Sequence, residues 1–393
     1  MKESVLIFCD NDISHNIPLT GIADILEKKE YQVLFCGGSK NRSYFESRNI
    51  EYRVIEAFNQ IKSNVKNDVD MGFFELNFLD AITNKEFKSI ENIKPSMVLL
   101  PYYISYLFPF LKKKYFEVKF CCVNILLRGE LFTPEYLFNF HYSALDSISK
   151  KKIAQILGKV EINLNNVIRD YYIDFKEFIL CPKELDISDK FIGQNVEYSE
   201  AIVGNPKEYT EDLNKNNLII FSMGSNSHLF PLVINSLVEK IVQCAILLKC
   251  YDQSFEMILS IPDGVLNPSV KGLCKRKNLE LVNWFDQNDL LSKAKVMITH
   301  CGVGSLKECI YTMTPMLCFP LTRDQPYNAN RVETLKLGKT LHPVDTDAKK
   351  IFDSLIELIE DKDYQQNLKE FRKLFYNYKE KETLYNQLTQ LTA

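Results

Sequence analysis

The segment whose residues are best suited to ligand chemistry is a short apolar strand followed by a turn with two glycines and a helix start. Val296–Thr299 forms the strand, and His300, Gly302, Gly304 and Ser305 come directly after it. Glycines let backbone approach a ligand, and the N–H groups and dipole of a helix start attract anions. The pattern is typical of a phosphate site, although ordinary strand-to-helix packing also uses it.

A second polar group follows the next apolar run. Residues 315–321 read as a buried strand, and Asp324 and Gln325 come shortly after it. A carboxylate beside a carboxamide can bind several vicinal hydroxyl groups of a sugar. Asp324 could also be the N-cap of the following helix, and both roles can hold together.

A lone histidine near the amino terminus could act as a base. The apolar run Val5–Cys9 is followed by His15 and Pro18 at the start of a helical pattern. A neutral imidazole can accept the proton of a hydroxyl group near neutral pH. Without further context, a histidine at a helix start is more often a capping or solvent-exposed residue.

The eleven cysteines and five histidines form no recognisable metal motif. No CxxC pair occurs, most cysteines lie in apolar runs, and the histidines are scattered. We therefore predict reduced core thiols and no metal site. Asp68 and Asp70 form a short acidic pair, which we interpret as part of a solvated loop.

Composition narrows the classes of partner. Forty-eight basic against fifty-one acidic residues give a net charge of -3, which argues against a broad nucleic-acid or anionic-membrane surface. The first apolar run soon reaches a charged residue, unlike a signal peptide, and no eighteen uncharged apolar residues follow one another. We expect a soluble, cytoplasmic protein whose membrane contact, if any, is peripheral.

The elements that would position these residues alternate between strands and helices in both halves of the chain. The expected strands are 5–9, 32–36, 97–100, 118–123, 218–221, 256–261, 279–282 and 296–299, and the expected helices include 18–29 and 229–248. This alternation predicts an α/β fold of two doubly wound, Rossmann-like domains facing across a cleft. Ligands of such sheets bind at the carboxyl ends of the strands.

Turn residues and charges around position 205 separate the two halves. We expect an N-terminal domain over 1–205, a linker over 206–217 and a second domain over 218–375. Residues 376–393 are expected to form a helix that packs back on the N-terminal domain.

The polar residues between 284 and 325 resemble the donor-binding signature of UDP-dependent glycosyltransferases, an inverting family with the two-domain GT-B fold. In that family the signature begins with Trp and Gln, reaches a strand ending in His-x-Gly and closes with Asp-Gln. The matching residues here are Trp284, Gln287, His300, Gly302, Asp324 and Gln325. The Gly-Val-Gly-Ser turn is most similar to the bacterial macrolide-type branch.

This resemblance implies a nucleotide-sugar donor bound by the second domain. Trp284 would stack on uracil, Glu308 would hold the ribose, and Gln325 hints at glucose as the sugar. UDP-sugar or dTDP-sugar would be a co-substrate, with no other cofactor and no metal. The donor-binding residues implied are Ser222, Gly224, Ser225, Trp284, Phe285, Gln287, His300, Gly302, Val303, Gly304, Ser305, Glu308, Asp324 and Gln325.

The same resemblance makes His15 the catalytic base, in a motif similar to the family's His-x-x-Pro. Relatives carry an orienting Asp just after the strand that corresponds to 97–100, but this chain continues Pro101-Tyr102-Tyr103. Asp10, Asp12 and Glu130 are possible substitutes by their position near predicted strand ends. The sequence does not choose among these three.

In this family the N-terminal domain holds the acceptor. Aromatic residues are plentiful there, which suits a lipophilic small molecule, although most will be core. The acceptor contacts expected on this basis are Phe73, Tyr102, Tyr103 and Phe132. Two other functions stay open: a noncatalytic GT-B partner protein, and a GT-B nucleotide-sugar epimerase or lipid-linked transferase. Nothing in the sequence indicates the oligomeric state.

Overall fold

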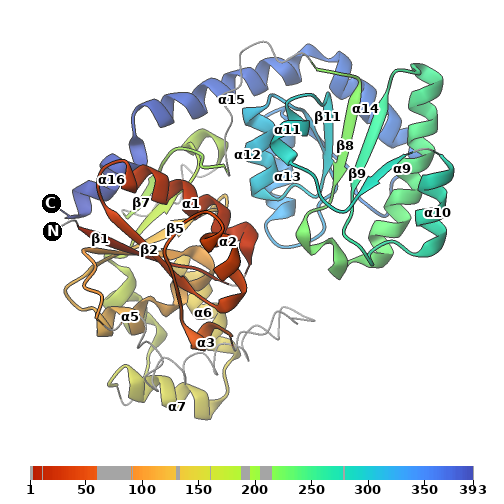
Figure 1. Cartoon of the computed structure of the whole chain (residues 1–393). Helices are drawn as coiled ribbons and strands as arrows, with labels where there is room; N and C mark the ends of the chain where they lie inside the picture. Colours follow the sequence, from red (N-terminus) through yellow and green to blue (C-terminus); the bar gives the residue numbers. More distant parts are fainter. Residues whose placement is uncertain are drawn as a thin grey trace. The chain divides into compact units, whose positions relative to one another are not determined.

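The computed structural model of the 393-residue chain divides into two compact units (Figure 1). Unit 1 comprises residues 1–204 and 380–393, and unit 2 comprises residues 205–379. The structure describes residues 3–10, 12–59, 90, 92–129, 133–159, 161–186, 195–203, 215–277 and 279–392. Most of the predicted linker, over 206–217, lies outside these residues.

Unit 1 contains a seven-stranded parallel sheet in the order β3-β2-β1-β4-β5-β6-β7. Its strands are β1 (Ser4–Phe8), β2 (Gln32–Gly37), β3 (Tyr52–Val54), β4 (Met97–Pro101), β5 (Lys119–Asn124), β6 (Lys176–Ile179) and β7 (Val196–Tyr198). Its helices include α1 (Ile13–Glu27), α2 (Arg42–Glu46), α3 (Glu56–Asn59), α5 (Phe108–Lys114), α6 (Pro134–Ala144), α7 (Ser147–Ile156), α8 (Leu164–Val167) and α16 (Thr383–Thr392). A 3-10 segment, η4 (Tyr102–Leu107), follows β4.

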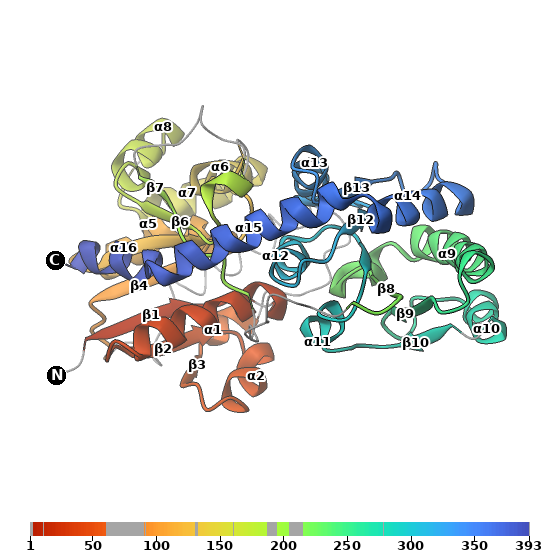
Figure 2. The same cartoon turned by 90° about the horizontal axis from the view of Figure 1, so that it is seen from above.

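Unit 2 contains a six-stranded parallel sheet in the order β10-β9-β8-β11-β12-β13. Its strands are β8 (Leu218–Ser222), β9 (Glu256–Ser260), β10 (Glu280–Val282), β11 (Val296–Thr299), β12 (Met316–Cys318) and β13 (Gly338–Thr340). Its helices are η7 (Ser225–Leu229), α9 (Pro231–Tyr251), α10 (Pro268–Arg276), α11 (Gln287–Leu291), α12 (Val303–Tyr311), α13 (Gln325–Thr334), α14 (Ala348–Glu360) and α15 (Lys362–Glu380). Helices α9 and α10 cover one face of the sheet, and α12 and α13 cover the other (Figures 1 and 2).

The central strands of both sheets are apolar because helices cover both of their faces. Val5, Leu6 and Ile7 of β1 are fully buried, as are Ile219 and Ile220 of β8. In each unit the strand order reverses direction beside the first strand, between β1 and β4 and between β8 and β11. These switch points are where doubly wound sheets bind ligands, at the carboxyl ends of the strands.

Helix α9 is long and apolar enough to cross a membrane by length and composition. It does not meet the criterion of eighteen consecutive uncharged apolar residues, because Glu239 and Lys240 interrupt the apolar run. One face of α9, including Ile234, Val238 and Ile241, is fully buried in the core of unit 2. We interpret it as a core helix of that unit.

The last helix belongs to unit 1. Helix α15 continues past residue 376 to Glu380. The helical conformation is then interrupted at Glu382, whose φ is +47°. The backbone N–H of Leu384 then donates to the Glu200 carboxylate at 2.7 Å, and Gln387 donates to the Tyr198 carbonyl at 3.0 Å. The segment that packs on unit 1 is thus shorter than the 376–393 expected.

Candidate functional site

The predicted donor residues gather at one edge of the unit 2 sheet. Thr299 pairs in register with Ser222 on one side and with Cys318 on the other, so β8, β11 and β12 end at the same level. Ser260 and Val282 are the corresponding ends of β9 and β10. The predicted donor residues lie in the loops that follow these strands. Residues 284–325 and the loop after β8 therefore come together at one edge of the sheet.

His300 lies at the switch point of unit 2, between two glycines. A Cβ atom added to Gly224 would lie 2.5 Å from His300 Cε1, and one added to Gly302 would lie 2.6 Å from Nε2. Gly224 also has a φ of +74°, which side chains rarely allow. Both glycines are therefore required for the imidazole to occupy this position.

Burial makes His300 a neutral side chain. It lowers the pKa of His300 to about 4, and a contact with the backbone of Ser222 only partly opposes this effect. Nδ1 is buried without a hydrogen-bond partner among the described residues. A neutral imidazole still carries one N–H, so His300 can donate a hydrogen bond to an anionic oxygen without bringing a charge.

Helix α12 begins beside His300 with its first N–H groups available for an anion. Gly302 is the N-cap and supplies no side-chain cap, and the first helical bond runs from Leu306 N to the Gly302 carbonyl at 3.0 Å. The N–H groups of Val303, Gly304 and Ser305 precede that bond, so they have no partner within the helix. With the helix dipole, they form a site suited to phosphate.

Trp284, Phe285 and Gln287 come directly after β10. The Trp284 side chain is 78% exposed, which excludes the core role that a lone Trp would ordinarily have. Gln287, three residues further on, donates from Nε2 to Ser305 Oγ at 2.9 Å and to Glu308 Oε2 at 2.5 Å. Burial raises the pKa of Glu308 to about 7, although the hydrogen bond from Gln287 acts in the opposite direction. Phe285 is half-buried.

Asp324 and Gln325 are both held by hydrogen bonds within unit 2. Asp324 is at the N-cap of α13 but makes no side-chain cap bond; its Oδ2 instead accepts from Asn328 Nδ2 at 2.7 Å. Gln325 Oε1 accepts from the backbone N–H groups of Leu321 and Thr322 at 2.8 and 3.0 Å. The capping alternative for Asp324 therefore does not apply, and the Gln325 oxygen is already occupied.

His15 lies at the switch point of unit 1, and its carboxylate partner is Asp10. His15 Nδ1 and Asp10 Oδ2 are 2.6 Å apart, and the other Asp10 oxygen accepts from the Asp12 N–H at 2.9 Å. His15 Nε2 lies 3.9 Å from Asp12 Oδ2. If Nδ1 carries the hydrogen, Nε2 is the basic nitrogen. Of the three substitutes considered, Asp10 has the geometry of an orienting group, and Glu130 lies outside the described residues.

Tyr103 lies in η4, the 3-10 segment directly after β4. Its ring stacks on His15 with the centroids 4.0 Å apart and the planes inclined by 14°. Tyr102, the neighbouring predicted acceptor contact, is only 2% exposed, so its ring belongs to the core of unit 1. Phe73 and Phe132, the other two predicted acceptor contacts, lie outside the described residues.

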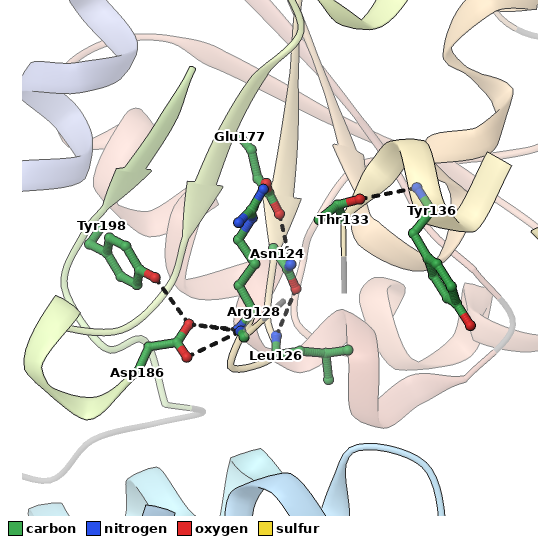
Figure 3. A network of polar contacts seen from close by, with 9 residues as sticks. Asn124, Leu126, Arg128, Thr133, Tyr136, Glu177, Asp186 and Tyr198 are labelled. Atoms are coloured by element: carbon green, nitrogen blue, oxygen red, sulfur yellow. Dashed lines mark hydrogen bonds and ion pairs between the residues drawn. The ribbon is translucent and has the colours of Figure 1, made fainter. Parts of the chain in front are cut away.

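A buried polar network, which the sequence does not predict, links β6 to the end of β5 and the loop that follows it (Figure 3). Arg128 Nε lies 2.8 Å from Glu177 Oε2, and Asn124 donates to the other Glu177 oxygen at 2.8 Å. Asp186 accepts from the backbone N–H groups of Arg128 and Gly129. Burial raises the pKa of Glu177 to about 7, while Arg128 opposes this shift. The network fixes the loop that leaves β5 on the same edge of the sheet as His15.

No group of three or more His, Cys, Asp or Glu side chains suited to a metal ion occurs within the described part of the chain. All eleven cysteines are free, and Cys250 alone among them is exposed. Asp68 and Asp70 fall outside the described residues.

Comparison with known proteins decides the family. The model of the family described as UDP-glucoronosyl and UDP-glucosyl transferase matches residues 139–378, which is more than half of the chain. The chain belongs to this family. The resemblance inferred from residues 284–325 is thereby confirmed, while the bacterial branch suggested by the Gly-Val-Gly-Ser turn stays a prediction.

Individual relatives of this UDP-glycosyltransferase family member are distant. UDP-glucuronosyltransferase 1A1 of Rattus norvegicus is 27% identical over 253 residues, covering 62% of this chain and 42% of the rat protein. The chain thus spans less than half the length of that relative. A glycotransferase of kitacinnamycin aligns over 100% of both chains with a TM-score of 0.76 and 14% identity. Glycosyltransferase VinC, solved in complex with dTDP, aligns over 99% of both with a TM-score of 0.68 and 12% identity. These likenesses confirm the two-domain GT-B fold.

Proposed function

We propose that this protein transfers a sugar from a UDP-sugar to a hydroxyl group of a lipophilic small molecule, with inversion at the anomeric carbon. The observation that carries the proposal is the 2.6 Å contact between His15 Nδ1 and Asp10 Oδ2 at one switch point. It supplies an oriented base in a family whose donor residues occupy the other switch point. The name of the rat relative and the dTDP complex of the structural neighbour support a nucleotide-sugar donor.

His15 is the general base of this reaction. Asp10 holds the imidazole with Nδ1 toward the carboxylate, so Nε2 takes the proton of the acceptor hydroxyl as its oxygen attacks the anomeric carbon. The C–O bond to the diphosphate breaks on the opposite side, which inverts the configuration. Asp10 stabilises the imidazolium that results.

The leaving nucleoside diphosphate is stabilised by unit 2. The N–H groups of Val303, Gly304 and Ser305 and the neutral His300 donate hydrogen bonds to the oxygens that gain charge. Trp284 stacks on the base, and Glu308 accepts from the ribose hydroxyls. We propose that this suffices without a divalent metal, that glucose is the sugar, and that the protein works in the cytoplasm.

The test is a transfer assay with defined donors and acceptors. Purified protein is first screened for a rise in melting temperature with UDP, dTDP and GDP, since a ligand of the folded state raises its stability. It is then incubated with UDP-glucose and a panel of phenols, with and without EDTA. A β-glucoside that forms equally well with EDTA supports the proposal, whereas an α-glucoside contradicts inversion. No nucleotide effect and no glycoside would favour a noncatalytic GT-B partner protein.

A further inference from the structure

Asn328 connects two parts of the candidate donor site that lie in different loops. It is on α13, and its side chain is fully buried. Nδ2 donates to the Cys301 carbonyl at 2.9 Å and to Asp324 Oδ2 at 2.7 Å. Because both partners are acceptors, both N–H bonds of the amide are used, and the orientation of the amide is fixed. The oxygen Oδ1 has no partner among the described residues.

The bond to Cys301 fixes a strained turn. Cys301 has a φ of +64°, a left-handed conformation that is uncommon for any residue but glycine. Its N–H is already bonded to Thr299 Oγ1 at 3.2 Å. The carbonyl of Cys301 and the N–H of Gly302 belong to one planar trans peptide and point in opposite directions. By holding that carbonyl, Asn328 sets the direction of the N–H at the start of α12.

The bond to Asp324 fixes the other part of the site. The Asp324 carboxylate is 8% exposed and makes no cap bond to its own helix. A backbone bond from Asn328 N to the Asp324 carbonyl at 2.9 Å adds a second link. The position of the carboxylate therefore depends on the same side chain that holds the phosphate turn.

We propose that Asn328 is a positioning residue that couples the phosphate turn to the sugar-binding carboxylate. The inference rests on the proposed function, because it assigns Cys301–Gly302 to the diphosphate and Asp324 to the sugar. These two groups flank the bond that breaks in transfer, so their relative position affects how the sugar is presented to the acceptor. Asn328 itself touches neither substrate; it acts through the groups it holds.

The coupling predicts a difference between two ligands. UDP contacts the phosphate turn but not Asp324, whereas UDP-glucose contacts the turn and Asp324 together. Replacement of Asn328 should therefore weaken the binding of UDP-glucose much more than the binding of UDP. A residue that merely stabilises the fold would weaken both ligands equally, or neither.

The experiment compares Asn328→Ala with the matched control Asn235→Ala. Asn235 is on α9 of the same unit and also donates two hydrogen bonds from Nδ2, to the carbonyls of Pro231 and Val265 at 2.7 and 2.9 Å. Trp284 is the only tryptophan and is exposed, so its fluorescence reports binding of UDP and of UDP-glucose. We expect Asn328→Ala to raise the Kd of UDP-glucose about 30-fold and that of UDP less than 5-fold, which corresponds to the loss of one or two hydrogen bonds. Asn235→Ala should change neither Kd by more than 2-fold.

A second variant, Asn328→Asp, is used in case Asn328→Ala does not fold. Asn328→Asp keeps the volume of the side chain but removes both N–H donors and places a second carboxylate beside Asp324, so it should show the same split between ligands. In an Asp324→Ala background, Asn328→Ala should add less than 3-fold to the Kd of UDP-glucose. Equal effects on UDP and UDP-glucose would overturn the coupling while leaving the proposed function intact. Absence of binding to the unmodified protein would overturn both.

Discussion

The two switch points of this chain have the same topology and different chemistry. In unit 2, the position between β8 and β11 holds His300 against Gly224 and Gly302, with a helix start beside it. No carboxylate within the described part of the chain is bonded to the ring. In unit 1, the position between β1 and β4 holds His15 against Asp10 and Tyr103. One histidine is kept neutral by burial, and the other has a carboxylate at its Nδ1.

The difference follows from what surrounds each ring. Burial lowers the pKa of His300 to about 4, so the ring is neutral near pH 7. His15 Nδ1 instead has a carboxylate oxygen of Asp10 at 2.6 Å. In the proposed function, unit 2 provides the anion site and unit 1 the proton-transfer site, so variants of each should affect separate properties.

The largest effect is expected from adding a methyl group beside His300. Gly224→Ala would place a Cβ within 2.5 Å of the ring in a backbone with φ +74°, so either the imidazole or the turn must move. We expect nucleotide binding to be lost at millimolar UDP and stability to fall by about 1–3 kcal/mol. Calorimetry and urea unfolding would measure the two effects.

The control for this variant is Gly272→Ala in helix α10. An added Cβ there meets only the flexible end of Arg276 at 3.3 Å, and alanine favours helix. Stability should stay equal or rise, and UDP binding should not change. If Gly224→Ala still binds UDP, the position of His300 does not depend on a glycine at position 224.

The next largest effect concerns the partner of His15. Asp10→Asn keeps the shape but removes the charge that stabilises the imidazolium, so kcat should fall about 100-fold. The Kd of UDP should remain within 2-fold, because Asp10 belongs to unit 1. Steady-state kinetics and fluorescence titration would separate the two quantities.

Asp12→Asn serves as the comparison for Asp10. Asp12 Oδ2 is 3.9 Å from His15 Nε2, beyond hydrogen-bonding distance. Its replacement should lower kcat less than 5-fold. Equal losses in both variants would mean that Asp10 has no special role as the orienting carboxylate.

A smaller effect is expected at the exposed indole of Trp284. Stacking of an aromatic side chain on a base contributes about 1–3 kcal/mol, so Trp284→Ala should raise the Kd of UDP roughly 10-fold. Because the side chain is 78% exposed, the melting temperature should change by little. Trp284→Phe should recover most of the affinity in calorimetry; no difference between Ala and Phe would argue against stacking.

The smallest effect is a pH dependence of stability. Burial raises the pKa of Glu308 from 4.5 to about 7, so the folded chain binds this proton more tightly than the unfolded chain does. The resulting stabilisation is present below pH 4.5 and is lost as the pH rises through about 7. Glu308→Gln should flatten the fall in unfolding free energy between pH 5 and 8, measured by urea unfolding. Glu177, whose pKa is also raised to about 7, should leave a residual slope.

Sequence reasoning succeeded where the chemistry is local along the chain. Apolar runs predicted β1, β8 and β11, and the glycines beside His300 predicted the turn, because strand ends and turn residues leave a direct trace in the sequence. The orienting carboxylate could not be chosen from the sequence, since Asp10, Asp12 and Glu130 all follow strand ends. Only the three-dimensional path of the chain brings Asp10 onto Nδ1.

Two other features depended on contacts between distant segments. Arg128 and Glu177 are forty-nine positions apart, and nothing in their local sequences pairs them. Asn328 is four positions after Asp324 on one helix, a spacing that does indicate contact, but its bond to Cys301 spans twenty-seven positions. The coupling between the two loops was therefore hidden in the sequence.

The most direct test of the division between the two switch points is His15→Ala, assayed for glycoside formation and for UDP binding on the same preparation. The account predicts that transfer from UDP-glucose falls by about 10³-fold or more, while the Kd of UDP stays within 2-fold. Transfer at the unmodified rate, or loss of UDP binding together with transfer, would contradict it.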